Sequence, residues 1–208
     1  MILLLRTAKF EELASPENIL LLATDIRGLF RANLNLSDFL IQFNTFFPEK
    51  MKLFVEAFGS MVSSSPDLDI NIINMSLKMC KSIIVRPSSK RIEFDKNSAN
   101  GIILFTFAAQ LISIFINYME NNSDNQKFLE DFAKSEYREF KCCTKILSSL
   151  LSGGYVPFEA FFIYEDSVFA SVLSDFVQLF NTFDLDDFCS YPNAFNSLIN
   201  FFKELCSH

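Results

Sequence analysis

The chain has 208 residues, half of them hydrophobic, and a formal net charge of −7. This hydrophobic content excludes a disordered protein, and the negative charge argues against non-specific nucleic-acid binding, which requires a basic face. The 26 phenylalanines, five glycines and absent tryptophan favour packed helices over a turn-rich β fold.

Capping residues and prolines mark the predicted helices of the first half. Ser15-Pro16-Glu17 combines a capping hydroxyl, a proline and an acid, and predicts a helix over residues 16–32. Ser37 predicts a short helix through residue 47, and Pro48 opens another. Pro66 opens a fourth. Its predicted apolar face is Ile73, Leu77, Cys80 and Ile84, and its predicted polar face is Asn71, Asn74, Lys78 and Lys81.

Residues 102–119 contain no charge and are nearly long enough to span a membrane. Thr106, Gln110, Ser113 and Asn117 recur at helical spacing, however, and form one narrow polar stripe that Glu120 continues. This pattern favours an inner helix of a layered protein, and a membrane span is the alternative interpretation.

Amphipathic segments continue through the second half. Helices are predicted over residues 134–152, residues 166–183 and from Tyr191-Pro192 onward, with an acidic loop over residues 184–187. The apolar positions predicted to align are Tyr137, Phe140, Leu147 and Leu151 in the first; Phe169, Val172, Leu173, Phe176, Leu179, Phe180 and Phe183 in the second; and Phe195, Leu198, Ile199, Phe202 and Leu205 in the third.

These elements predict an all-α fold, a HEAT/armadillo-like antiparallel helical-repeat superhelix, or α-solenoid. Helix pairs recur at roughly forty-odd residues, and no alternating strand pattern has any length. We expect residues 1–208 to form a single solenoid segment of roughly four to five helix pairs. Because neither end has the polar character of a capping repeat, this segment is predicted to belong to a longer solenoid.

Residue types for catalysis and metal binding are scarce. The only histidine is His208, at the chain end, and no glycine-rich phosphate loop is present. The five cysteines form no C-x-x-C pair and indicate free thiols in a reducing compartment. We predict a protein that is not an enzyme, with no cofactor and no metal.

Two groups of residues are candidates for protein binding. The first is a charged connecting loop with one aromatic: Arg86, Lys90, Arg91, Glu93, Phe94 and Asp95. The alternative is that Phe94 packs into the core while Asp95 caps the next helix. The second group is Asp25 and Arg27, which either form a polar staple between helices or face a ligand.

Residues 91–105, RIEFDKNSANGIILF, resemble a signature segment of the exportin-7 / Ran-binding-protein family of importin-β-like karyopherins. Further stretches resemble the same family in the same order: DIRG at 25–28, residues 147–161 with the motif LSGGYVPFEAF and, more loosely, residues 164–166, 178–180 and 186–192. Together they cover most of residues 22–202. The resemblance is to a segment of the carboxyl-terminal half of such a receptor.

The resemblance implies a nuclear transport receptor segment that binds protein cargo, Ran-GTP and Phe-Gly nucleoporins, and that shuttles between nucleus and cytoplasm through the nuclear pore. The negative net charge and the polar stripe within residues 102–119 predict no nucleic-acid partner and no membrane insertion. The family's amino-terminal Ran-binding repeats have no counterpart in this chain. The alternative is a helical-repeat scaffold without transport activity.

Aromatic residues of the second half are open to two interpretations. At helical spacing they are core residues; in a receptor of this family they could also line grooves for Phe-Gly side chains. The residues concerned are Phe158, Phe161, Phe162, Tyr164, Phe176, Phe180 and Phe183.

Overall fold

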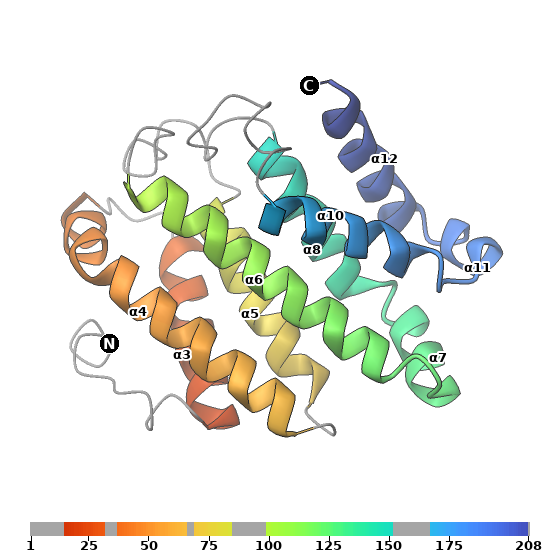
Figure 1. The fold of residues 1–208 in the computed structure, drawn as a ribbon, viewed down its shortest axis with the longest axis horizontal. Coiled ribbons are helices and arrows are strands. Elements are labelled where there is room, and N and C mark those ends of the chain that lie inside the picture. Colours follow the sequence, from red (N-terminus) through yellow and green to blue (C-terminus); the bar gives the residue numbers. More distant parts are fainter. Residues whose placement is uncertain (1–14, 32–36, 66–68, 85–98, 152–166, 208) are drawn as a thin grey trace.

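The computed structural model describes residues 15–31, 37–65, 69–84, 99–151 and 167–207 (Figure 1). This part of the chain contains nine helices and no strand. The helices are α3 (Pro16–Arg31), α4 (Ser37–Ser64), α5 (Ile70–Ile84), α6 (Ala99–Asn121), α7 (Gln126–Lys134), α8 (Arg138–Leu151), α10 (Ser167–Phe180), α11 (Leu185–Cys189) and α12 (Pro192–Cys206).

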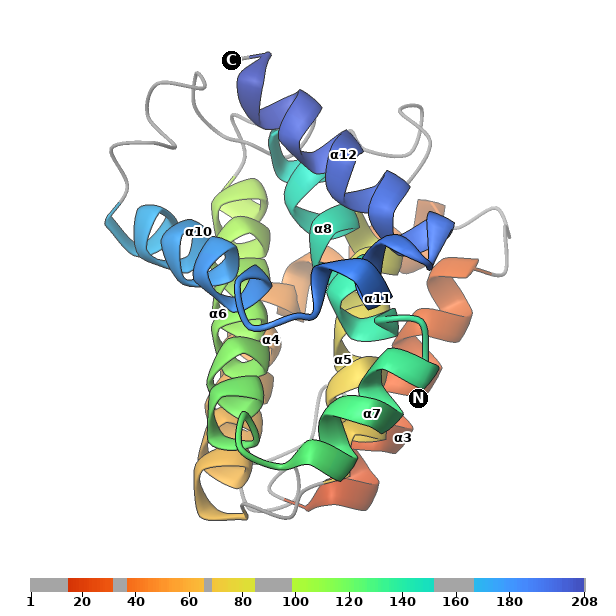
Figure 2. The same cartoon turned by 90° about the vertical axis from the view of Figure 1, so that its right-hand side faces the viewer.

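The long helices form two layers (Figures 1 and 2). In one layer α5 packs between α3 and α8, and α12 packs on the far side of α8. In the other, α6 packs between α4 and α10. Successive helices alternate between the layers, as in stacked helix pairs, and the prediction of an all-α helical-repeat fold is confirmed.

The predicted repeat period is too short. The first-layer helices begin at Pro16, Ile70, Arg138 and Pro192, each more than about 50 residues after the one before. The 28 residues of α4 and the additional helices α7 and α11 account for the extra length.

Several predicted helix boundaries are wrong. Pro48 lies inside one continuous helix, α4, where two helices were predicted. An internal proline removes one backbone hydrogen bond but is tolerated where the helix bends, and α4 changes direction along its length in Figure 1. The next helix begins at Ile70 because Asp69 caps it: the Asn71 amide donates to Asp69 Oδ1 at 2.9 Å.

Helical periodicity correctly identified most of the core. Ile73, Leu77, Cys80 and Ile84 of α5 are all buried. On the predicted polar face of α5, Asn71 is exposed and Lys78 and Lys81 are half-buried, but Asn74 is buried. Asn74 Oδ1 has no hydrogen-bond partner within the described residues.

The polar stripe of α6 faces solvent. Thr106, Gln110 and Asn117 are exposed and Ser113 is half-buried, whereas Phe107, Phe115 and other apolar residues are buried. This confirms the interpretation of α6 as an amphipathic helix within a layered protein. Among the described helices, none combines the length and the apolar character that crossing a membrane requires.

The apolar face of the last helix is only partly as predicted. Pro192 occupies the first turn of α12, as expected, and Leu198 is buried. Phe195 and Ile199 are exposed, however, while Phe201 is buried. The buried side of α12 is therefore rotated about the helix axis relative to the predicted side. The helix packs on α8 and α11, and only part of its apolar surface lies in this contact.

The cysteines give a direct check of this core. All five are free thiols; Cys80, Cys142 and Cys143 are buried, and Cys189 and Cys206 are exposed. Burial raises the pKa of Cys142 to about 11 and raises the pKa values of the other two buried thiols as well. We expect Ellman's reagent at pH 8 to modify two thiols per native chain rapidly, and all five in denaturant. Rapid modification of three or more in the native protein would contradict this packing.

Candidate protein-binding site

The structure describes only two of the predicted binding residues. Arg86, Lys90, Arg91, Glu93, Phe94 and Asp95 lie outside the described residues, so a binding role for that loop stays a prediction. Asp25 and Arg27 lie on α3 and both are half-buried.

Asp25 and Arg27 do not act as a pair. They are two positions apart on one helix, so they project about 200° from one another. No ion pair joins Asp25 to a described cation. Arg27 instead reaches α5, where its Nη1 lies 3.9 Å from the Met75 sulfur. Arg27 therefore contacts a neighbouring helix, and the choice between a polar staple and a ligand-facing pair stays a prediction for both residues.

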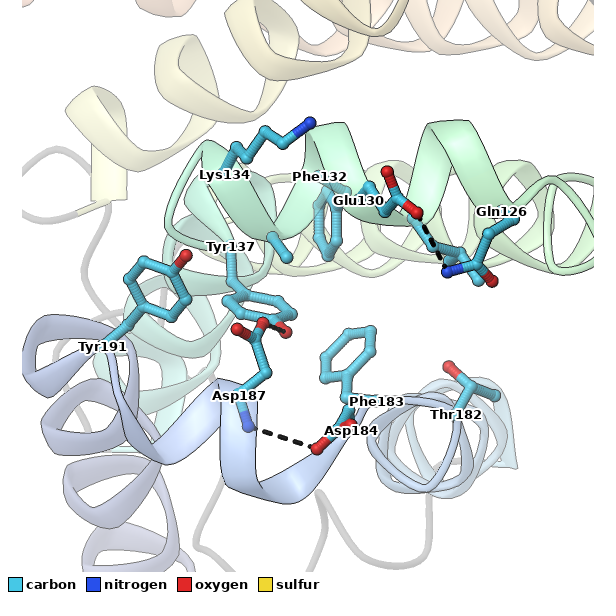
Figure 3. Close-up of a pocket in the computed structure, with 12 residues that line it drawn as sticks. Gln126, Glu130, Phe132, Lys134, Tyr137, Thr182, Phe183, Asp184, Asp187 and Tyr191 are labelled. Carbon is cyan, nitrogen blue, oxygen red and sulfur yellow. Dashed lines mark hydrogen bonds between the residues drawn. The ribbon is translucent and has the colours of Figure 1, made fainter.

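A pocket of about 620 Å³ opens between α7 and the turn that joins α10 to α11 (Figure 3). Three aromatic side chains, Phe132, Tyr137 and Phe183, line it and are buried. Carboxylates also line it, and Figure 3 shows Asp187 beside Tyr137. The lining residues that carry charge are Glu130, Lys134, Asp184 and Asp187.

Tyr137 connects the two sides of this pocket. Its hydroxyl donates a hydrogen bond of 2.7 Å to Asp187 Oδ2, and its ring lies 4.9 Å from that of Phe188 and 5.3 Å from that of Phe132. Burial, and then the hydrogen bond to Asp187, raise the pKa of the Tyr137 phenol. The phenol therefore stays neutral at physiological pH, and its proton remains available to Asp187.

The chain turn before α8 places Tyr137. α7 ends in a Schellman motif: the Glu136 amide donates to the Ala133 carbonyl at 2.7 Å, and the Tyr137 amide to the Phe132 carbonyl at 3.3 Å. Glu136 and Tyr137 consequently have φ of 57° and 51°, in the left-handed region. This region favours glycine, and the sequence has glutamate there.

Glu136→Gly is expected to raise the free energy of unfolding by about 0.5–1 kcal/mol, because glycine adopts this conformation without a Cβ clash. The exposed ion pair from Lys141 to Glu136 would be lost at little cost. Glu130→Gly, inside α7, is the matched control and should lower the free energy of unfolding by about 1 kcal/mol. Urea denaturation followed by circular dichroism measures the stability of both variants. An equal decrease in the free energy of unfolding of the two would contradict backbone strain at Glu136.

An aromatic floor beside carboxylates suits protein recognition. The floor can bury an apolar or aromatic side chain of a partner, and the carboxylates can contact a neighbouring cation or amide. Of the aromatic residues suggested for a groove, Phe183 lines this pocket. Phe176 is buried in the core and Phe180 is half-buried against it, whereas Phe158, Phe161, Phe162 and Tyr164 lie outside the described residues.

Comparison with known proteins identifies relatives that match most of this chain. It is 26% identical to "Exportin-7-B" of Xenopus laevis over 196 residues, which is 94% of this chain and 17% of the relative. It is 25% identical to "Ran-binding protein 17" of Homo sapiens over 174 residues, 82% of this chain and 15% of the relative. The predicted resemblance to the exportin-7 family is confirmed.

The chain spans less than a fifth of the length of these exportin-7 relatives. "Exportin-7" of Dictyostelium discoideum, for example, is 23% identical over 185 residues and matches over 18% of its length. No family model and no solved structure matches. The resemblance to exportin-7 is therefore to a segment of these longer proteins.

Sequence reasoning missed the Tyr137 pocket in this exportin-7-like chain. The two residues that define it are 50 positions apart, and the acidic stretch that holds Asp187 was predicted as a loop. It is instead capped by Asp184, whose Oδ1 accepts from the Asp186 and Asp187 amides, and forms α11. The sequence signal for this helix was Asp184 followed by two acidic residues in the next turn, a pattern typical of a capped helix start.

Proposed function

We propose that this chain is a protein-binding segment of an exportin-like nuclear transport receptor. The observation that carries the proposal is the similarity to exportin-7 and Ran-binding protein 17 over 82–94% of the chain. The layered helices support it, since stacked helix pairs present extended binding surfaces. In this proposal the chain acts in nucleocytoplasmic protein export by binding and without catalysis, and shuttles between nucleus and cytoplasm.

The proposed partners are protein cargo, Ran-GTP and Phe-Gly nucleoporins. The pocket between α7 and α11 is the proposed place for an apolar partner side chain, including the phenylalanine of a Phe-Gly repeat, because Phe132, Tyr137 and Phe183 line it. Ran-GTP binding is proposed for the longer solenoid of which this chain would be a segment.

Affinity capture of the tagged protein from cells, with and without GTP-locked Ran, tests this function. Recovery of Ran and nucleoporins, with a cargo set that changes with Ran-GTP, is the expected result. Stable partners without Ran and without nucleoporins would instead indicate the alternative function, a helical-repeat scaffold outside transport.

A further inference from the structure

The solvent-facing side of α5 is a narrow polar stripe. Most of this helix is buried between α3, α6 and α8, and the residues that reach solvent recur every three or four positions. Those with charged or polar side chains are Asn71, Lys78, Lys81 and Ser82. None of these α5 residues is a carboxylate, and the carboxylate at the start of the stripe, Asp69, accepts a hydrogen bond of 2.9 Å from the Asn71 side chain.

Arginines from both neighbouring helices reach this stripe. Arg27 of α3 contacts Met75 through Nη1 at 3.9 Å, and Arg138 of α8 donates from Nη2 to Asn71 Oδ1 at 3.5 Å. Lys145 lies two helical turns beyond Arg138 on α8, so it projects from the same face. We call the residues Arg27, Lys78, Lys81, Arg138 and Lys145 the basic strip.

Electrostatic effects on two side chains show that these cations lie close together. The pKa of the Lys78 ammonium is lowered, first by burial and then by the charges of Arg138 and Arg27. Burial raises the pKa of Cys142, and Lys81, Lys78 and Lys145 all act on it in the opposite direction. Cations from three helices therefore share one neighbourhood on the outside of the layer.

The basic strip has an excess of positive charge in a chain whose net charge is −7. α5 and α8 together carry Lys78, Lys81, Arg138, Lys141 and Lys145, and the acidic residue among them is Glu139. Glu139 is 1% exposed and pairs with Arg138. Lys78, Lys81 and Lys145 form no ion pair with a described residue.

We propose that the basic strip binds an acidic segment of a partner protein, a short run of aspartate and glutamate side chains. From Asn71 to Lys81 the stripe is about 15 Å long, which suits about four or five extended residues. Such a segment is held by several charge pairs at once. Arg27 provides guanidinium donors on one side, and Arg138 provides on the other side the donors that Glu139 does not occupy.

A peptide fits the strip better than a nucleic acid does. A long polyanion would extend past the five cations onto surface that is acidic overall, where it would be repelled. The proposal goes beyond transport because it fixes the chemistry of a partner on residues that do not line the α7–α11 pocket. It holds or fails whether or not Ran binds.

The test uses the full 208-residue chain and a fluorescein-labelled peptide of six glutamates, with six glutamines as the matched neutral peptide. Fluorescence anisotropy at 50 mM NaCl is expected to show at least about tenfold tighter binding of the glutamate peptide, weakening at 300 mM NaCl. No preference for glutamate would overturn the proposal, as would tighter binding of a single-stranded DNA of equal charge.

Lys78→Gln/Lys81→Gln locates the binding. This variant should weaken binding of the glutamate peptide by about fivefold or more. Lys52→Gln/Lys127→Gln changes the net charge equally on α4 and α7 and should change binding by less than about twofold. Equal losses in the two variants would show that only the net charge matters, and would overturn the proposal.

Folding of the variants does not limit the test. Burial first, and then the charges of Arg138 and Arg27, lower the pKa of the Lys78 ammonium, so replacing Lys78 should leave the thermal unfolding midpoint unchanged or raise it. Lys145 is exposed, and Lys145→Gln should weaken binding of the glutamate peptide by about twofold without affecting packing. If the double variant unfolds, unchanged binding by Lys145→Gln would overturn the proposal on its own.

Discussion

Phe140→Ala is expected to lower the free energy of unfolding by about 3–5 kcal/mol, the largest stability effect expected of any substitution argued for this chain. Phe140 is 0% exposed and lies where α8, α10 and α11 meet. Its ring stacks on that of Phe176 with centroids 4.8 Å apart, and lies 5.1 Å from Phe183 and 5.6 Å from Phe188. Truncation removes these contacts and leaves a cavity.

The same substitution on an exposed ring is the control. Phe195 of α12 is 39% exposed, so Phe195→Ala should cost about 1 kcal/mol or less. Urea denaturation followed by ellipticity gives both values, and Phe140→Leu should lie between them. Since small domains have about 5–15 kcal/mol of stability, Phe140→Ala should sharply lower the urea midpoint. A cost below about 1.5 kcal/mol would show that the junction of α8, α10 and α11 is loosely packed.

The regular parts of the fold were predictable because burial follows helical periodicity. The apolar face of α5 and the polar stripe of α6 each extend over several turns, so one irregular position does not hide the pattern. The interruptions were not predictable in the same way. Glu136 follows the end of α7 in a left-handed conformation that glycine usually occupies, so no glycine marks the end of that helix in the sequence. The helix predicted over residues 134–152 consequently began at the last residue of α7.

The sites were less predictable than the fold because they depend on contacts between distant residues. The Tyr137–Asp187 bond joins positions 50 apart, and the Arg138–Asn71 contact joins positions 67 apart. Lys78 and Lys81 were predicted on a polar face, but their role follows only from the arginines that α3 and α8 bring beside them. Periodicity gives the face of one helix and says nothing about its neighbours.

The second large effect concerns one buried carboxylate beside the basic strip. Glu139 Oε1 accepts a hydrogen bond of 2.9 Å from Arg138 Nε and lies 2.9 Å from Arg138 Nη2 in an ion pair, while Oε2 is buried without a partner among the described residues. The Arg138 side chain is 39% exposed and the Glu139 side chain 1%. The buried Glu139 carboxylate therefore depends on Arg138 to neutralise its charge, whereas the guanidinium of Arg138 also reaches solvent.

Arg138→Met is expected to lower the free energy of unfolding by about 3 kcal/mol, because it leaves a buried charge unpaired. Glu139→Met should change it by less than about 1 kcal/mol. It removes a costly buried carboxylate and fills the same space, which offsets the lost helix-dipole interaction in the first turn of α8, and Arg138 can turn to solvent.

The double variant Arg138→Met/Glu139→Met completes the cycle, measured by urea denaturation at pH 7. It should be close in stability to Glu139→Met alone, because with the carboxylate gone the arginine no longer has a buried charge to neutralise. Equal costs for the two single variants would instead show that the pair stabilises the fold as a symmetric ion pair. In that case Glu139 would hold the Arg138 guanidinium, which could then not bind an acidic partner. The expected asymmetry instead leaves N–H donors of this guanidinium available on its solvent side.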